Sequence, residues 1–198
     1  MLKIGLTGNI GSGKSLVCNI FESTGVPVFH ADEIGHAALQ DSEIHQELTH
    51  RYGPSILRPD GSLNRRALAE IVFNDSSALE HLNSLVHPFV KRRFDEWCSQ
   101  HTSAPFIIHE AAILFESGFN RYFDSLILVT APEVVRLQRV MTRDGLNEAE
   151  VKARMARQWP EKNKLPLVDY VIVNDGYTPL VPQVDNVLRN LAQKVKSW

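Results

Sequence analysis

The sequence predicts an α/β fold in which a five-stranded, mainly parallel sheet lies between two layers of helices. Five short apolar runs support this prediction, because strands that are buried on both faces read as continuous apolar segments. Longer segments with helical spacing separate the runs, and this alternation is typical of parallel α/β folds. The runs are Leu2–Thr7, Val26–His30, Phe106–His109, Ser125–Thr130 and Tyr170–Asn174.

Length and composition limit the class of protein. A chain of 198 residues, of which 43% are apolar and 22% charged, is expected to form one compact domain with a buried core. The net charge of -2 excludes a nucleic acid or an anionic membrane held by bulk charge. The chain has two cysteines without metal-ligand spacing and no apolar stretch that approaches roughly eighteen residues. We therefore expect a cytoplasmic protein without a membrane span or a disulfide framework, and the sequence specifies no oligomeric state.

Local signals mark several helix ends. Capping-box patterns stand at Ser77 with Glu80 and at Asn147 with Glu150. Pro88 is expected to kink or end the helix that reaches it, because proline lacks an N–H donor and restricts the residue before it.

The first loop of the predicted sheet carries a phosphate-binding motif. Residues 8–15, GNIGSGKS, match G-x-x-x-x-G-K-[ST] and stand between an apolar strand and a helix, as this P-loop requires. The glycines allow backbone N–H groups to surround an anion at the helix N-terminus. Lys14 is expected to reach the β and γ phosphates of a nucleotide, and the Ser15 hydroxyl is expected to help hold Mg²⁺. The predicted ATP-binding residues of this segment are Gly8, Gly11, Ser12, Gly13, Lys14, Ser15 and Leu16.

The spacing of the apolar runs divides the chain further. The second and third runs lie much further apart than a normal crossover requires, which predicts a helical insertion. A second excursion holds eight basic and four acidic residues and is expected to form a basic lid over the phosphates. We place the core at about 1–31, 106–135 and 165–198, the insertion at about 32–105 and the lid at about 136–164.

Two other classes of nucleotide-binding protein fit poorly. A signalling GTPase needs a guanine-reading N-K-x-D motif, and residues 163–166, NKLP, lack its aspartate. A protein kinase needs H-R-D and D-F-G elements, which are missing. The sequence therefore predicts a small phosphotransferase, in which the insertion holds the acceptor and the lid closes over the phosphates.

Asp32 is the candidate for activating the acceptor. It lies just beyond the carboxyl end of the second apolar run, and ligands of open parallel sheets bind at that edge. If this strand lies two places from the first, the lateral offset is roughly 10 Å, which leaves room for a phosphate and a hydroxyl. The carboxylate can accept the proton of an alcohol, and it can also cap the following helix. Both roles fit the sequence, and they can coexist.

An ordered set of further segments resembles the dephospho-CoA kinase family along essentially the whole chain. The matching residues are Ile4 to Ser15, Ala31-Asp32, His87-Pro88, Leu114-Phe115-Glu116, Arg139, Arg143 to Leu146, Arg154, Gln158 and Asp169 to Asn174. The resemblance implies Mg²⁺-dependent transfer of the γ-phosphoryl group of ATP to the ribose 3′-hydroxyl of dephospho-CoA, which is the last step of coenzyme A synthesis. It also implies that Asp32 is the catalytic base and that the insertion is the substrate domain.

The chain departs from the family pattern at two positions. Many relatives carry D-A-D where this chain has His30-Ala31-Asp32, so a role for the first aspartate does not transfer. Glu110 keeps a carboxylate at the end of the third strand, where relatives often have aspartate. Two roles fit Glu110, namely ordering a magnesium-bound water and pairing with a nearby base.

The lid supplies the remaining charged candidates. Arg136, Arg139 and Arg143 have the spacing of one helical face. We assign phosphate contacts to Arg139, as a catalytic residue, and to Arg143, as an ATP ligand, and we expect Arg136 to be a surface residue. Arg154 shares a helical face with Gln158 and is expected to bind nucleotide or substrate.

Three groups complete the predicted substrate site, together with Asp32 and Arg154. They are Thr7, His87 and Glu110. For His87, pairing with a substrate phosphate and a half-buried place at a helix end both fit the sequence.

Two rival functions fit part of this pattern. A kinase for another small alcohol or a nucleoside monophosphate would need the same phosphate-binding loop. A nucleotide-dependent switch protein would bind ATP without any turnover that depends on an acceptor. In each case the expected partners are small molecules, with no nucleic acid and no membrane.

Overall fold

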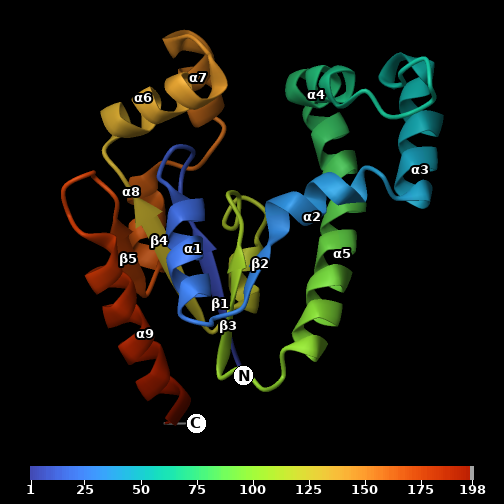
Figure 1. Cartoon of the computed structure of the whole chain (residues 1–198). Helices are drawn as coiled ribbons and strands as arrows, with labels where there is room; N and C mark the ends of the chain where they lie inside the picture. Colours follow the sequence, from blue (N-terminus) through green and yellow to red (C-terminus); the bar gives the residue numbers. More distant parts are fainter. Residues whose placement is uncertain (197–198) are drawn as a thin grey trace. The chain divides into compact units, whose positions relative to one another are not determined.

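The computed structural model describes residues 1–196, apart from the side chain of Phe73. The chain divides into two compact units, Met1–His30 with Gln100–Trp198 and Ala31–Ser99. The first unit contains the sheet, and the second is helical (Figure 1).

The sheet of the first unit has the strand order β2-β3-β1-β4-β5, and every neighbouring pair is parallel. This confirms the predicted five-stranded sheet. The strands are β1 (Leu2–Thr7), β2 (Val28–His30), β3 (Phe106–Glu110), β4 (Ser125–Thr130) and β5 (Tyr170–Val173). The β2 strand lies two places from β1, which is a lateral offset of roughly 10 Å.

The helices of the first unit follow the strands along the chain. They are α1 (Lys14–Ser23), α6 (Glu133–Asp144), α7 (Glu148–Met155), α8 (Glu161–Lys164) and α9 (Leu180–Lys196), with the short 3₁₀ helices η2 (Phe119–Tyr122) and η3 (Leu165–Leu167). Apolar side chains of α1 and α9 pack with Ile4 and Leu6 of β1 in one buried core. On the opposite face Gly5 meets Leu114 and Phe123 so closely that a Cβ would lie 2.8 and 2.9 Å from them. The sheet is therefore covered on both sides.

The second unit has a core of its own. Its helices are α2 (Ala31–Ala38), α3 (Ser42–Tyr52), η1 (Gly53–Ile56), α4 (Arg65–Asn74) and α5 (Ser76–Gln100). Leu48, Ile56 and Leu68 are almost completely buried in this core.

Two of the predicted helix ends in α5 differ from the structure. The N-cap is Asp75, whose Oδ1 accepts hydrogen bonds from the backbone N–H groups of Ser77 and Ala78, so the predicted capping box at Ser77 is wrong. The helix also continues through Pro88 to Gln100, so Pro88 does not end it; a kink at this position, the other predicted outcome, stays a prediction. The capping box of Asn147 in α7 is confirmed, with both reciprocal hydrogen bonds present.

No helix among residues 1–196 combines the length and the apolar character that crossing a bilayer requires.

Candidate functional site

The P-loop joins β1 to α1 and leaves the start of α1 open. The N-cap residue is Gly13, with φ 89° and ψ 31°, and no side chain caps the helix. The first turn contains no acidic residue. Because the first N–H groups of a helix have no intrahelical acceptor, they form a site for an anion together with the positive end of the helix dipole.

Glycine is required in this loop for two reasons. Gly11 and Gly13 have φ angles of 81° and 89°, which residues with a side chain rarely adopt. A Cβ on Gly11 would lie 2.5 Å from the carbonyl oxygen of Arg136, and a Cβ on Gly13 would lie 2.1 Å from Nδ2 of Asn174. The loop is therefore packed tightly against α6 and against the residue that follows β5.

Arg139 of α6 holds this packing together. Its Nη1 donates hydrogen bonds to the carbonyl oxygens of Gly11, at 3.4 Å, and of Asn174, at 3.1 Å, and its Nη2 donates to Asn174 Oδ1 at 3.3 Å. Asn174 in turn donates to the carbonyl oxygen of Ser12 at 2.8 Å. Arg139 is thus placed against the P-loop backbone, and its contact with a phosphate stays a prediction.

Lys14 and Glu110 meet beside the loop. The Nζ atom of Lys14 lies 3.6 Å from Oε1 of Glu110, and both side chains are largely buried, with 13% and 9% exposed. His30 lies beside Glu110 in the β2–β3 pairing, and its Nδ1 is 3.6 Å from Oε2 of Glu110. The Nε2 atom of His30 lies 3.1 Å from Glu22. A buried carboxylate needs such partners, so the pairing of Glu110 with a nearby base is present in this structure.

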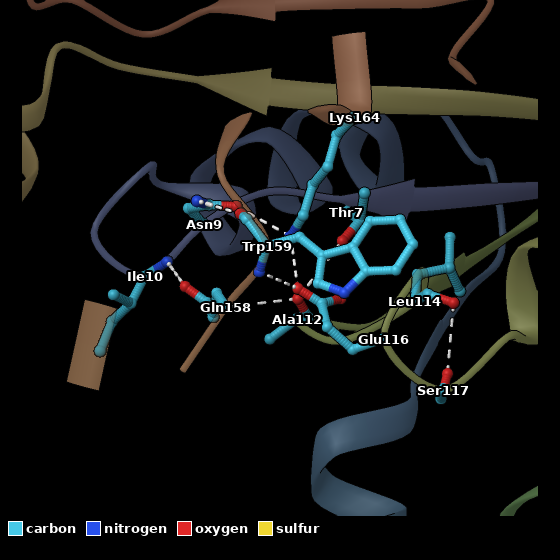
Figure 2. Close-up of polar contacts among 10 residues, drawn as sticks. All are labelled: Thr7, Asn9, Ile10, Ala112, Leu114, Glu116, Ser117, Gln158, Trp159 and Lys164. Carbon is cyan, nitrogen blue, oxygen red and sulfur yellow. Dashed lines mark hydrogen bonds and ion pairs between the residues drawn. The ribbon is translucent and has the colours of Figure 1, made fainter. Parts of the chain in front are cut away.

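A second set of contacts to the P-loop comes from Gln158, in the segment between α7 and α8 (Figure 2). Gln158 Oε1 accepts a hydrogen bond from the backbone N–H of Ile10 at 2.7 Å, and its Nε2 donates to the carbonyl oxygen of Ala112 at 3.3 Å. Thr7 is fully buried, and its hydroxyl donates to the same carbonyl oxygen at 3.5 Å. Gln158 therefore links the P-loop to the segment that follows β3.

A buried lysine was missed by the sequence reasoning. Lys164 counted there as one of the basic lid residues, yet its side chain is 0% exposed and lies between Asn9 and Glu116 (Figure 2). A lysine four residues after a proline carries no sequence signal for burial. The resemblance to the family included Glu116 but not Lys164, so it pointed to only one of the two partners of this ion pair.

Arg143 and Arg154 both contact Asp144. The Nε of Arg143 lies 2.7 Å from Oδ1 of Asp144, and Nη1 of Arg154 lies 3.0 Å from Oδ2. The hydrogen bond from Arg143 holds the pKa of the exposed Asp144 carboxyl below its ordinary value and raises the pKa of Arg143. Of the three predicted binding arginines, Arg139 contacts the P-loop, whereas these two form an ion-pair cluster within the lid.

Arg136 is a correction to the sequence analysis. We expected a surface residue, but its side chain is buried, with 7% of the residue exposed, and Nε donates to the carbonyl oxygen of Ala131 at 3.0 Å. Its own carbonyl faces Gly11. The face of α6 that packs on the P-loop therefore includes Arg136, which the spacing of charges alone does not reveal.

A cavity of about 770 Å³ adjoins the P-loop at the carboxyl ends of β4 and β5. Its lining includes Asn9, Thr130, Arg136, Gln158 and Glu161. Burial raises the pKa of the Glu161 carboxyl above its ordinary value. This edge of the sheet is therefore hollowed and carries charged groups of both signs.

The two remaining predicted residues belong to the helical unit. Asp32 lies in the first turn of α2 and is exposed, and α2 begins directly after β2 ends at His30. His87 is half-buried in α5, and burial lowers the pKa of its imidazole. The first unit therefore contains Thr7, Lys14, Glu110 and Arg139, whereas Asp32 and His87 belong to the helical unit.

Oxygen donors for a metal are few at the P-loop. Among residues 1–196 no group of three His, Cys, Asp or Glu side chains is close enough to hold a metal ion. Mg²⁺ is commonly held by one or two protein oxygens together with nucleotide phosphates and water. The exposed Ser15 at the start of α1 and the carboxylate of Glu110 fit that donor chemistry.

Comparisons with known proteins agree with this architecture. The dephospho-CoA kinase from Bacteroides fragilis strain YCH46 is 36% identical over 195 residues, which cover 98% of this chain and 95% of the relative. The crystal structure of TT1252 from Thermus thermophilus matches with a TM-score of 0.85 and 36% identity, over 98% of this chain and 97% of that one. Dephospho-CoA kinase from Campylobacter jejuni matches with a TM-score of 0.70 and 27% identity, over 97% and 98%.

A family model gives the same result. The model for dephospho-CoA kinase matches residues 2–179, a range that contains the P-loop, the helical unit and the predicted lid segment 136–164. This match, the level of identity and the shared fold lead to one conclusion: the chain belongs to the dephospho-CoA kinase family.

Proposed function

We propose that this protein transfers the γ-phosphoryl group of ATP to the ribose 3′-hydroxyl of dephospho-CoA, giving coenzyme A and ADP in the final step of coenzyme A synthesis. The observation that carries the proposal is the uncapped start of α1, with Lys14 beside Glu110, in a chain of this family. The site of the reaction is the cytoplasm, where ATP is available.

The acceptor hydroxyl is activated by Asp32. An aspartate that follows a strand of a parallel sheet directly has the position from which ligands at the carboxyl edge are bound. Asp32 is exposed and stands two residues after β2. Its carboxylate orients the 3′-hydroxyl and accepts its proton as the oxygen attacks the terminal phosphorus.

The charge that develops on the phosphates is balanced by cations. Lys14 lies at the first turn of α1, from which its ammonium reaches the β and γ phosphates. Arg139 is already fixed against the backbone of Gly11 and adds a second cation. Phosphoryl transfer depends mainly on such positioning and electrostatic stabilisation.

Mg²⁺ is the proposed metal cofactor. When bound, it would supply positive charge that offsets part of the charge of the ATP phosphates. The Ser15 hydroxyl would help to hold the metal, and Glu110 would order a magnesium-bound water. Residues 32–105 form the acceptor domain in this proposal, and His87 of this domain binds the substrate. Residues 136–164 form the lid, in which Arg143 binds ATP and Arg154 binds the acceptor.

One experiment tests the function directly. The protein is incubated with ATP, Mg²⁺ and dephospho-CoA, and the product is weighed by mass spectrometry, with coupled ADP release measured over a panel of acceptors. We expect a mass increase of one phosphoryl group and acceptor-dependent ADP release. If another alcohol or a nucleoside monophosphate were turned over as fast as dephospho-CoA or faster, that compound would be assigned as the acceptor instead. ADP release that no acceptor stimulates would favour a switch protein.

A further inference from the structure

A fully buried ammonium lies directly against the P-loop. The Nζ atom of Lys164, the last residue of α8, donates to Oδ1 of Asn9 at 2.9 Å and lies 2.8 Å from Oε1 of Glu116 (Figure 2). Lys164 is 0% exposed and Glu116 is 14% exposed. Removing a charge from water costs several kcal/mol, and here the carboxylate and the amide oxygen compensate for that cost.

The side chain of Asn9 is held at both ends. Oδ1 accepts from Lys164, and Nδ2 donates to the carbonyl oxygen of Trp159 at 3.1 Å. The backbone carbonyl of Asn9 accepts from the N–H of Ser12 at 3.0 Å, which forms the turn at the beginning of the P-loop. Asn9 is 5% exposed. The position of the Lys164 ammonium therefore determines how Asn9 and this turn are oriented.

Neighbouring contacts reinforce the same arrangement. The backbone N–H of Trp159 donates to Glu116 Oε1 at 2.8 Å, and Gln158 accepts from the N–H of Ile10 at 2.7 Å. The N–H groups of Ile10 and Ser12 are thus occupied by the protein itself. The first N–H groups of α1 have no intrahelical acceptor and can bind an anion, so the turn before them must present them at the correct angle.

A buried ion pair is by itself weak support for stability. Replacing such a pair with apolar side chains is often neutral or stabilising, whereas removing one partner is strongly destabilising. The pair of Lys164 and Glu116 is not among the apolar core residues, and the second partner of the ammonium, Asn9, is a P-loop side chain. This location argues for a role in shaping the loop.

We propose that Lys164 is a positioning residue of the phosphoryl transfer. Paired with Glu116, its ammonium fixes the Asn9 side chain and so holds the first turn of the P-loop in the shape that binds the phosphates of ATP. The inference depends on the proposed function for the reaction that it serves. Its primary effect is on ATP binding, which is measurable without any acceptor.

The test compares three variants with the wild-type protein. They are Lys164→Met, the double variant Lys164→Met with Glu116→Leu, and the control Lys162→Met, which removes an exposed lysine from the same helix. The measurements are the melting temperature, the Kd for ATP by calorimetry without acceptor, and the KM values for both substrates.

The positioning role predicts a distinct pattern. Lys164→Met lowers the melting temperature and weakens ATP binding by at least about tenfold, because Glu116 and Asn9 lose their cation. The double variant recovers the melting temperature but keeps the weak ATP binding, since Asn9 still lacks its donor. The KM for dephospho-CoA stays within about twofold of wild type, and Lys162→Met behaves as wild type. Recovery of ATP affinity in the double variant would overturn the proposal.

A second variant covers the case in which Lys164→Met does not fold. Asn9→Ala removes the side chain that Lys164 is proposed to orient and leaves the ion pair in place. We expect the same loss of ATP affinity, and wild-type affinity in Asn9→Ala would sink the inference. Failure of the proposed function is a separate result, since a wild-type protein that binds ATP without phosphorylating dephospho-CoA leaves these binding predictions intact.

Discussion

The ammonium of Lys14 lies 3.6 Å from the carboxylate of Glu110, and these two residues stand at the first position of α1 and the last position of β3. Glu110 is the last residue of β3 and pairs in register with Leu6 of β1, so the sheet fixes its position relative to the P-loop. The carboxylate therefore holds the ammonium beside the P-loop.

The first prediction concerns Lys14. Lys14→Ala removes the cation proposed for the β and γ phosphates, and we expect kcat/KM for ATP to fall at least about a hundredfold. Coupled ADP release with dephospho-CoA measures this loss. Lys162→Met, which removes an exposed lysine, is the matched control for loss of positive charge. An undiminished rate in Lys14→Ala would contradict the assignment of the phosphate site.

The second prediction concerns Asp32. Asp32→Asn keeps the size of the side chain but removes the proton acceptor, so kcat should fall by about 10² to 10⁴ while the KM for ATP stays within about twofold. The adjacent Glu33→Gln, also exposed in α2, should keep wild-type turnover. Steady-state kinetics with both substrates varied separate these outcomes, and near-normal kcat in Asp32→Asn would remove Asp32 from the mechanism.

The third prediction separates two lid arginines. Arg139→Ala loses hydrogen bonds to Gly11 and Asn174, and we expect both a lower kcat and a loss of about 1 to 3 kcal/mol in the free energy of unfolding. Arg143 is exposed and contacts Asp144, so Arg143→Ala should change that free energy by less than about 0.5 kcal/mol and still lower kcat. A large stability loss with unchanged kcat in Arg143→Ala would mark Arg143 as structural.

The fourth prediction concerns acid sensitivity. His109 of β3 is packed among the rings of Phe29, Phe119 and Phe123, and burial lowers its pKa to about 3. The unfolded chain therefore binds a proton below about pH 6.5 that the folded protein excludes. Stability should fall as the pH drops from about 6.5 toward 3, by up to about 1.4 kcal/mol per pH unit from this residue.

Urea unfolding at pH 7.5 and pH 5 measures this dependence. His109→Phe should show a smaller loss of unfolding free energy between the two pH values, because the buried group no longer titrates. His50→Gln, an exposed position in α3, should keep the wild-type dependence. If His109→Phe loses as much stability as the wild type, the acid sensitivity originates elsewhere.

Much of the sheet and of the P-loop was predictable because their signals are local. Runs of apolar residues found every strand, and the β2 run began two residues early. The spacing of Gly8 to Ser15 placed the loop before a helix. A reciprocal cap at Asn147 needs only its own four residues, so the sequence contained all the information for that helix start.

The missed features depend on contacts that are distant in sequence. Lys164 and Asn9 are 155 positions apart, and charge patterns alone treat Lys164 and Arg136 as solvated. The same holds for α5, which continues through Pro88 although proline disfavours helix. The neighbouring Phe89 and Val90 are buried, and their packing stabilises the helix at this point. Tertiary packing outweighed local preference at each of these positions.

The bracing of the P-loop by Gln158, Lys164 and Asn174 has a consequence for biosynthesis. The motif of the loop, Gly8 to Ser15, is translated before the side chains that give it shape, which follow more than about a hundred residues later in the chain. A nascent chain therefore contains the motif before the contacts that hold the loop in shape can form. We expect the loop to bind ATP only after Asn174 has been synthesised.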